Sequence, residues 1–360
     1  MFDFRSLTVP VVGAPMAGGP STPELVAAVG AAGGFGFLAT GYAAAAKVGR
    51  DIAELRQRTD APFGLNVFVP ESISVDVSSL DAYRALLAER AARFGAHLPH
   101  EIPYSDDDFD AKIALAIDES VPVVSFTFGA PTVEVIARLH RHDICVVSTV
   151  TTVAEARLAA AAGVDALCVQ GPEAGGHRGT FHIADTPGEL SLDQLLEQVR
   201  AVTELPLIAS GGIATADRAV PLLALGADAV QVGTLLLRTP EAGTKPAHKD
   251  ALADPRFTET VLTRAFSGRP ARALRNSFVD EFSAAAPAAY PYVNTLTAAL
   301  RKAAAADPDT LNLWAGTGYR HAGTEPAAVV IARLGAQIAE LRCTPSHSDL
   351  TLTSHRAARE

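Results

Sequence analysis

The sequence predicts an α/β fold, a TIM (β/α)8 barrel with a smaller, mostly helical second lobe after the eighth strand. Short apolar runs alternate with Ala-rich segments of helical length, a pattern typical of repeated βα units. The runs are apolar along most of their length, as expected of parallel strands covered on both faces. The chain has 360 residues, which fits one such barrel with an insertion.

Eight apolar runs are predicted as strands, and most of them are followed at once by Gly or Pro. Helix start signals lie between the runs: Ser21 with Glu24 and Thr152 with Glu155 both fit a capping box. The predicted strands are Val9 to Ala14, Phe35 to Thr40, Phe63 to Val69, Val121 to Phe128, Ile144 to Thr149, Ala166 to Gln170, Leu207 to Ala209 and Ala229 to Gly233.

The βα pattern is interrupted once before the eighth strand. Residues 70–120 form a long connection between the third and fourth strands, and an extra helix is predicted around Leu80 to Phe94. The acidic run Asp106-Asp107-Asp108 is interpreted as a solvated turn, because no set of histidine or glutamate ligands flanks it.

The rest of the chain divides into three parts. We expect residues 1–235 and 321–343 to form the barrel, with Ala327 to Leu341 as a final amphipathic helix that returns to it. Residues 236–320 hold most of the late aromatic residues and are predicted to form a lobe that caps the barrel mouth. The polar segment 344–360 is predicted to be a flexible tail.

Composition excludes several classes of partner. The net charge of −10 argues against nucleic acid, whose phosphates repel an acidic surface. No apolar stretch has the length of a membrane span or a signal peptide, so we expect a cytoplasmic protein with no membrane partner. The three cysteines lack CxxC spacing and the histidines lack ligand spacing, so no metal is expected. A homodimer is compatible with these features.

Two glycine-rich strand ends indicate a phosphate site. In a TIM barrel the carboxyl ends of the strands meet at one mouth, and phosphate groups often bind after the seventh and eighth strands. Ser210-Gly211-Gly212 and Gly233-Thr234 occupy these positions. Either segment alone is equally well explained as a tight turn. Together they favour a phosphate, and room for a single phosphate suits FMN better than a dinucleotide.

His177 is the candidate catalytic base. It lies in a glycine-rich segment, Glu173 to Gly179, directly beyond the sixth strand, which we interpret as a flexible loop. Imidazole titrates near neutrality and can remove a proton from a carbon next to an electron-withdrawing group. A surface histidine bonded to its own loop is the ordinary alternative, but the position at the mouth favours catalysis. His182 is a weaker candidate, because its loop leads away from the strand end.

The remaining candidates are less specific. Asn66 follows the third strand and is suited either to a flavin edge or to capping the strand end. Tyr290 and Tyr292, with Lys302 about a helix later, are candidates for lining a substrate pocket or for packing the lobe. A serine nucleophile is disfavoured, because the chain lacks a GxSxG elbow and Ser267 has no evident base.

The chain resembles the nitronate monooxygenase (2-nitropropane dioxygenase) family from about residue 9 to residue 340. The most specific matching element is the GGHRG sequence around His177. The matching segments are Gly13 to Gly18, Val123 to Gly129, Gln170 to Gly179, Ile208 to Ile213, Gln231 to Thr234, Phe266 to Arg272 and Leu313 to Gly316.

The resemblance implies an FMN-dependent enzyme that oxidises alkyl nitronates, such as propionate 3-nitronate, or nitroalkanes with dioxygen, giving carbonyl compounds and nitrite. His177 would be the base that admits neutral nitroalkanes. Substrate contacts are assigned more weakly to Ser125, Thr127, Tyr290, Tyr292 and Lys302. The expected cofactor contacts are Ala14, Pro15, Met16, Asn66, Gln170, Gly175, Ser210, Gly211, Gly212, Gln231, Val232, Gly233 and Thr234.

One position departs from the pattern of the most similar subgroup. Many of its members carry a second histidine where this chain has Thr127. Threonine can donate a hydrogen bond to a nitro oxygen but cannot carry a positive charge, which affects the expected substrate more than the flavin.

Three other functions are compatible with a flavin barrel. An enoyl-acyl carrier protein reductase or a quinone reductase would oxidise NADH rapidly. A flavin-binding module without activity would hold FMN and turn over neither nitronate nor NADH.

Overall fold

Eight parallel strands close into a barrel, and the last of them pairs back to the first. The computed structural model describes residues 1–71 and 76–343, so the predicted tail at 344–360 lies outside the described residues. All eight predicted strands are present, with ends that differ from the prediction by at most two residues. The strands are β1 (Val11–Gly13), β2 (Phe35–Ala39), β3 (Phe63–Phe68), β4 (Val123–Thr127), β5 (Cys145–Val150), β6 (Ala166–Gln170), β8 (Leu207–Ser210) and β9 (Ala229–Val232).

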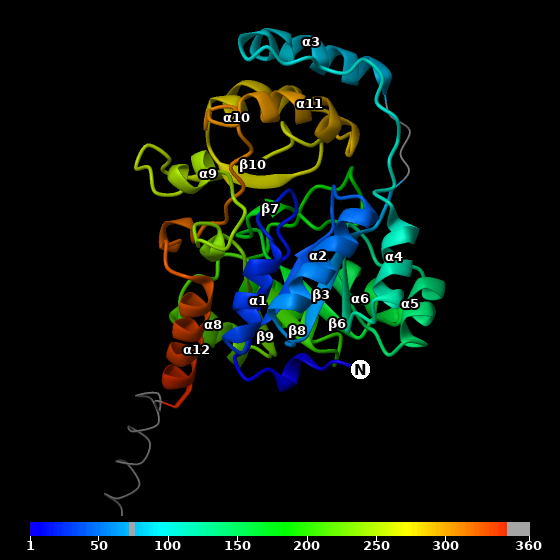
Figure 1. Cartoon of the computed structure of the whole chain (residues 1–360), viewed down its shortest axis with the longest axis vertical. Helices are drawn as coiled ribbons and strands as arrows, with labels where there is room; N and C mark the ends of the chain where they lie inside the picture. The colour runs from blue at the N-terminus through cyan, green and yellow to red at the C-terminus, as the bar shows by residue number, and fades with distance from the viewer. Residues whose placement is uncertain (72–75, 344–360) are drawn as a thin grey trace, which may run out of the picture.

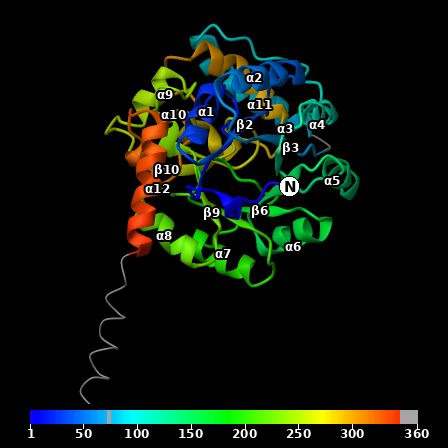
Figure 2. The same ribbon diagram turned by 60° about the horizontal axis from the view of Figure 1, so that its bottom comes forward.

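The helices between the strands form an outer ring, which Figure 2 shows around the barrel. The predicted capping box of Thr152 and Glu155 is formed at the start of α6. The predicted cap Ser21 is wrong by one residue: Thr22 caps α1, because Pro23 takes the first helical position. The ring contains α1 (Pro23–Ala31), α2 (Ala45–Arg58), α4 (Phe109–Asp118), α5 (Val133–His140), α6 (Val153–Ala162), α7 (Leu192–Arg200), α8 (Ala216–Ala224) and the predicted final helix α12 (Ala327–Cys343).

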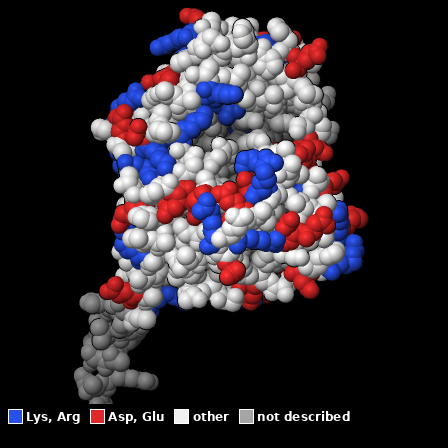
Figure 3. Space-filling view, viewed as in Figure 1, with Lys and Arg blue, Asp and Glu red and all other residues white. Residues whose placement is uncertain are grey.

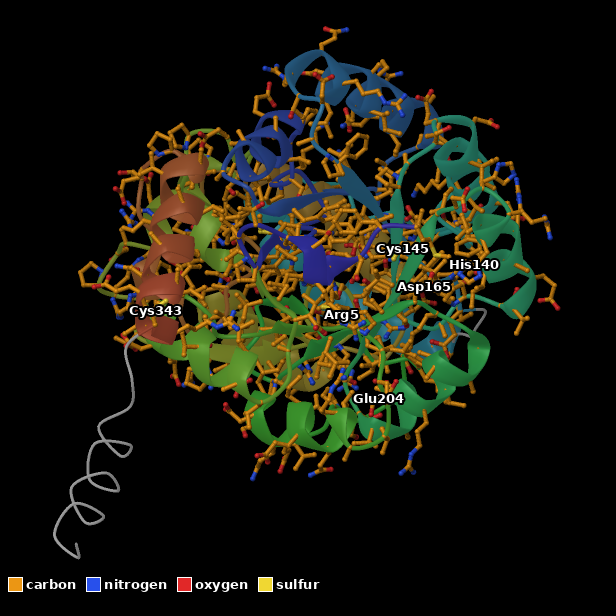
Figure 4. The ribbon with its side chains drawn as sticks, turned by 90° about the horizontal axis from the view of Figure 1, so that it is seen from below. Arg5, His140, Cys145, Asp165, Glu204 and Cys343 are labelled. Carbon is orange, nitrogen blue, oxygen red and sulfur yellow. The ribbon has the colours of Figure 1, made fainter. Side chains whose placement is uncertain are left out.

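The amino end of the barrel is closed by the first residues of the chain. A short 3-10 helix, Phe4–Ser6, places the buried Phe4 against Phe35 of β2, with ring centroids 5.3 Å apart. Arg5 bonds to the Asp228 carboxylate at 3.2 Å and to the Glu204 carbonyl at 3.1 Å. Figure 4 views the barrel from this end and labels Arg5 and Glu204. The opposite, carboxyl end is therefore the open one.

The second lobe has an apolar core of its own, built around Phe266, Phe278 and Leu296. Figure 1 shows it above the barrel. As predicted, it is mostly helical, and it also contains a hairpin. Its elements are α9 (Pro246–Ala251), β10 (Thr260–Thr263), β11 (Ala271–Leu274), α10 (Ser277–Phe282), α11 (Tyr292–Ala303) and 3-10 turns at Thr234–Leu236, Ser283–Ala285 and Tyr319–His321.

The predicted extra helix exists as α3 (Val77–Arg93), but it packs on the lobe. Its apolar stripe of Leu80, Tyr83 and Leu87 joins the lobe core, and the Tyr83 hydroxyl donates to the Ala265 carbonyl at 2.6 Å. This packing differs from the prediction that all of residues 1–235 belong to the barrel. The sequence of an amphipathic helix indicates which face is buried but not which part of the protein covers it. The packing of α3 on the lobe is therefore seen only in the folded chain.

A short strand joins the lobe to the barrel. Strand β7 (Gly176–His177) pairs antiparallel with β11, with His177 opposite Ala271. The Arg178 N–H extends the ladder by donating to the Pro270 carbonyl at 2.8 Å. The segment interpreted as a flexible loop is therefore held as the edge of a three-stranded sheet. This pairing fixes the backbone of the candidate base.

The acidic run is structural and only partly solvated. Asp107 accepts from the Tyr42 N–H at 2.9 Å and pairs with the fully buried Lys112 at 2.7 Å. Asp108 accepts from the Ala45 N–H at 3.1 Å and so caps α2, whose own N-cap residue, Ala44, has no side-chain acceptor. The predicted turn is present, and Asp106 and Asp108 are exposed, but Asp107 is partly buried. Asp107 and Asp108 also accept from backbone N–H groups of the β2–α2 connection.

Candidate functional site

A cavity of about 270 Å³ opens at the carboxyl end of the barrel, beneath the lobe. Figure 3 shows a hollow between the two parts of the molecule on the face of Figure 1. Fourteen residues predicted for the site line this cavity, although they come from six different strand ends and connecting loops. They are Ala14, Pro15, Met16, Asn66, Thr127, Gln170, Gly175, His177, Ser210, Gly211, Gly212, Gln231, Gly233 and Thr234.

Five predicted site residues do not line the cavity. Val232 points outward into the core between strands and helices, because side chains alternate along a strand. Ser125 is buried behind Asn66. Tyr292 packs against the lobe core, and Lys302 is exposed on the outside of α11. Tyr290 lies beside the cavity, with its ring centroid 6.0 Å from that of His177.

Aromatic rings surround the His177 imidazole. Its ring centroid lies 5.8 Å from Phe128 and 5.2 Å from Trp314. Burial is the main cause that lowers the pKa of His177 to about 3, and the positive charges of Arg269 and Arg301 contribute to the same shift. The imidazole is therefore neutral at physiological pH, and a neutral imidazole has one nitrogen with a free lone pair.

Ser267 determines which nitrogen of the His177 imidazole carries the free lone pair. The His177 Nε2 lies 2.8 Å from the Ser267 Oγ, which in turn donates to the Arg269 carbonyl at 3.2 Å. Since the hydroxyl has one proton and donates it to that carbonyl, it accepts from Nε2–H. The lone pair is then on Nδ1, which has no partner within residues 1–71 and 76–343.

The Ser267–His177 pair is not a nucleophile with its base. Ser267 is 1% exposed, so no substrate carbon can reach its oxygen. The sequence shows no base for Ser267, because Ser267 and His177 lie far apart in the chain. The pairing of β7 with β11 brings them together in the fold. Ser267 instead holds the ring of His177.

The glycine segments form a cradle of free backbone donors. In the described part of the chain, the N–H groups of Gly212 and Gly233 donate to no acceptor. Gly212 has φ +65, and a Cβ there would lie 2.9 Å from both the Glu173 Cβ and the Thr317 Oγ1. Only glycine fits this backbone without displacing its neighbours. Such converging N–H groups suit a phosphate.

Polar side chains at the other strand ends leave unpaired acceptors. The Asn66 Nδ2 donates to the Ser125 Oγ at 2.9 Å and to the Thr127 Oγ1 at 3.0 Å, and no group within residues 1–71 and 76–343 donates to its Oδ1. The Gln231 Nε2 donates to the Ser210 Oγ at 3.2 Å, and its Oε1 likewise has no donor in the described part of the chain. The Thr127 hydroxyl accepts from Asn66 and keeps its own proton for a ligand. These groups can orient a ring that carries N–H and carbonyl functions.

Gln170 lines the cavity and also forms hydrogen bonds to the backbone on both sides of Arg178. Its Nε2 donates to the His177 carbonyl at 3.0 Å, and its Oε1 accepts from the Gly179 N–H at 2.8 Å. Gln170 therefore fixes both ends of the segment that carries the candidate base.

Several cavity residues were missed by the sequence analysis. Tyr42, Lys245, Arg301 and Trp314 all line the cavity. Arg301 directly precedes the predicted Lys302, so the position on α11 was correct to within one residue and the face of the helix was wrong. Helical periodicity could have separated the two, because Leu300 and Thr297 mark the buried face.

No cluster of three or more His, Cys, Asp or Glu residues that could hold a metal is present in the described residues. No helix among residues 1–71 and 76–343 is long and apolar enough to cross a membrane. Cys145 and Cys168 are buried and unpaired, while Cys343 is exposed at the end of α12. A closed parallel barrel whose carboxyl mouth holds a cavity lined by apolar residues, several polar side chains and a histidine is the arrangement of a TIM-barrel enzyme.

Comparisons with known proteins identify the family. Residues 3–336 match the nitronate monooxygenase family. A probable nitronate monooxygenase of Staphylococcus aureus strain Newman is 36% identical over 346 residues, which cover 93% of this chain and 96% of that protein. The structure of a nitroalkane oxidase from Streptomyces ansochromogenes is 47% identical, with a TM-score of 0.90 and coverage of 93% of this chain and 97% of that one. The chain therefore belongs to the nitronate monooxygenase family and is an oxidoreductase.

A second structure is more distantly similar. FabK from Thermotoga maritima is 26% identical, with a TM-score of 0.74, and the match covers 94% of this chain and 96% of that one. The same barrel and lobe therefore occur in FabK.

Proposed function

We propose that this protein uses FMN to oxidise alkyl nitronates or nitroalkanes with dioxygen, giving carbonyl compounds and nitrite, with propionate 3-nitronate as a representative substrate. The observation that carries the proposal is the neutral His177 imidazole at the cavity, held by Ser267 at 2.8 Å. Family membership over residues 3–336 supports the reaction class.

The residues at the cavity fit FMN. Gly211, Gly212, Gly233 and Thr234 would hold its phosphate on free backbone donors, and Asn66 and Gln231 would meet its ring with their free acceptors. Ala14, Pro15, Met16 and Gly175 would provide the remaining contacts. When bound, the flavin supplies the electron transfer between substrate and dioxygen.

His177 Nδ1 would take the proton from the carbon next to the nitro group, which converts a neutral nitroalkane to its nitronate. The Thr127 hydroxyl would donate to a nitro oxygen, and the positive charge of Arg301 would favour the anion that forms. The surrounding rings of Phe128, Tyr290 and Trp314 exclude water from the base. Two nitronates and one dioxygen give two carbonyl compounds and two nitrites, which balances atoms and charge.

Steady-state turnover tests this proposal. The holoenzyme is mixed in air with propionate 3-nitronate, and separately with NADH, while nitrite, dioxygen and NADH are followed. Nitrite formation with dioxygen consumption supports the proposal. Rapid NADH oxidation without nitrite would replace it with the reductase alternative. A cytoplasmic location and a homodimer remain predictions.

We expect no ionisation of His177 in the physiological pH range. A pKa of about 3 means that the basic form is present above that pH and is lost only as pH falls through it. The activity of the wild type on one nitroalkane is divided by that of His177→Asn at each pH. Because substrate ionisation affects both activities equally, it does not affect this ratio. This ratio should be constant between about pH 5 and pH 8. An ordinary pKa near 6.5 would instead reduce it about tenfold by pH 5.5.

Ser267→Ala should weaken proton abstraction by releasing the imidazole ring. Losing one orienting hydrogen bond is expected to lower kcat on a nitroalkane about tenfold, with KM and nitronate oxidation changed less than about threefold. Ser267→Thr keeps the hydroxyl and should restore part of the rate. Equal losses on nitroalkane and nitronate, with no rescue by threonine, would show that Ser267 serves only the packing of the lobe.

A further inference from the structure

A buried arginine lies behind the candidate base. Arg269 is 1% exposed and does not line the cavity. Burial lowers the pKa of its guanidinium to about 10, so the group is still charged at neutral pH. Burying a charged group is costly unless its contacts compensate the loss of water. The contacts of this guanidinium therefore indicate what it stabilises.

Two segments of the barrel hold the fork of the guanidinium. The Arg269 Nη1 donates to the Thr180 carbonyl and, at 3.1 Å, to the Thr180 Oγ1, and its Nη2 pairs with the Glu71 Oε2 at 3.4 Å. Thr180 lies three residues after His177, and Glu71 follows β3. Arg269 itself precedes β11 of the lobe. Its side chain thus reaches from the lobe to the segment that carries the base.

The face of the guanidinium lies on the ring of Phe128. The Arg269 Cζ is 4.1 Å from the centroid of this ring, which is a close cation–π contact. Phe128 follows β4 and has φ +76, a conformation that few residues other than glycine adopt. Such a residue keeps its place only because the surrounding structure holds it. The stacked guanidinium is one of the groups that do so.

Phe128 in turn packs against the imidazole of His177. The two ring centroids are 5.8 Å apart and the planes meet at 84°, an edge-to-face contact. Ser267 binds the Nε2 of this imidazole at 2.8 Å, and the Trp314 ring lies 5.2 Å away on centroids. These three neighbours fix the direction of Nδ1, so a displaced Phe128 ring would let the imidazole turn.

We propose that Arg269 is a positioning residue for proton abstraction: its guanidinium holds Phe128 against the His177 ring, so that Nδ1 is directed at the substrate carbon. The inference rests on the proposed function and adds to it a residue that touches neither substrate nor cofactor. Loss of the guanidinium should slow proton abstraction from a nitroalkane. It should leave the oxidation of a nitronate, which arrives without that proton, nearly unchanged.

Arg269→Met tests the proposal on nitroethane and on its nitronate. Any residue at this position keeps the main-chain N–H and carbonyl that bind the Ser267 hydroxyl at 3.3 and 3.2 Å. Misplacing a catalytic group by about 1 Å can cost about a hundredfold, so kcat on nitroethane should fall at least about tenfold. The kcat on the nitronate should stay within about threefold of the wild type, because the base is not needed there.

The lobe offers a matched control. Arg256 stacks on Phe257 at 4.5 Å, is exposed and does not line the cavity. Arg256→Met therefore removes the same kind of contact away from the base, and it should change neither activity.

Phe128→Leu tests the route from Arg269 to the base. It keeps the arginine and its charge, and it should produce the same selective loss on nitroethane. In the double variant the loss should exceed that of Phe128→Leu by no more than about twofold, because both changes remove one interaction. Losses that multiply in the double variant would contradict the route. If Arg269→Met does not fold or does not keep its flavin, Phe128→Leu decides alone, and a wild-type kcat on nitroethane would overturn the inference.

The outcomes separate the two proposals. If the wild-type holoenzyme oxidises neither nitroethane nor its nitronate, the proposed function fails. If it oxidises both, and Arg269→Met with full flavin content lowers both equally or neither, the function stands and the positioning role of Arg269 is wrong.

Discussion

His177→Asn should lose nitroalkane oxidation and keep nitronate oxidation. A positioned general base contributes about 10²- to 10⁴-fold, so kcat/KM on nitroethane is expected to fall at least about a hundredfold. A nitronate arrives without that proton and should be oxidised within about threefold of the wild-type rate. Asparagine is close to imidazole in size and can still donate to Ser267, which lies 2.8 Å from the ring.

The bound flavin provides the control for this variant. His177 belongs to strand β7, and its backbone is held by β11 and by Gln170, so the substitution should leave the FMN content unchanged. Equal loss on nitroethane and its nitronate, with full flavin, would contradict the role of His177 as a base. It would then be a group needed for oxidation of the anion itself.

Gly212→Ala should release the cofactor. The added Cβ would lie 2.9 Å from the Glu173 Cβ and from the Thr317 Oγ1, so the backbone must shift and the free N–H groups of the cradle move with it. A hydrogen bond to a charged group contributes about 1.5–3 kcal/mol, so the affinity for FMN should fall at least about tenfold. Titration of the apoprotein with FMN, followed by flavin fluorescence, measures the change.

Two controls separate phosphate binding from backbone strain. Gly163→Ala places alanine at φ +97 at the end of α6, with nothing within 4 Å of the new Cβ, and should keep wild-type FMN affinity. Riboflavin lacks the phosphate, so its affinity should be nearly the same in Gly212→Ala and the wild type. An FMN affinity within twofold of the wild type, or an equal loss for riboflavin, would show that this glycine does not hold the phosphate.

The barrel was predictable because its signals are local. Each strand is a short apolar run, and its carboxyl end must lie at the mouth of a closed parallel barrel. The glycine-containing turns Ser210-Gly211-Gly212 and Gly233-Thr234, at two adjacent strand ends, could therefore be placed at one cavity from sequence alone. The histidine after β6 was found by the same rule.

The contributions of the lobe were not predictable in this way. Ser267 reaches His177 only because β11 pairs with β7, and Arg301 enters the cavity from α11. Both contacts join segments far apart in the chain. No local pattern specifies the pairing that brings Ser267 to His177, whereas the inward face of α11 follows from helical periodicity. The prediction of Lys302 follows from spacing alone, whereas the buried face marked by Thr297 and Leu300 favours Arg301. The packing of α3 on the lobe was not predictable, because the sequence of an amphipathic helix does not specify its partner.

Anaerobic mixing tests the central claim most directly. The purified holoenzyme is mixed without dioxygen with propionate 3-nitronate, and in a separate experiment with NADH, while the flavin absorbance is recorded. We expect the nitronate to bleach the flavin and nitrite to appear in step with turnover once air is admitted. Rapid bleaching by NADH, with no response to the nitronate, would contradict the account and make the protein a reductase.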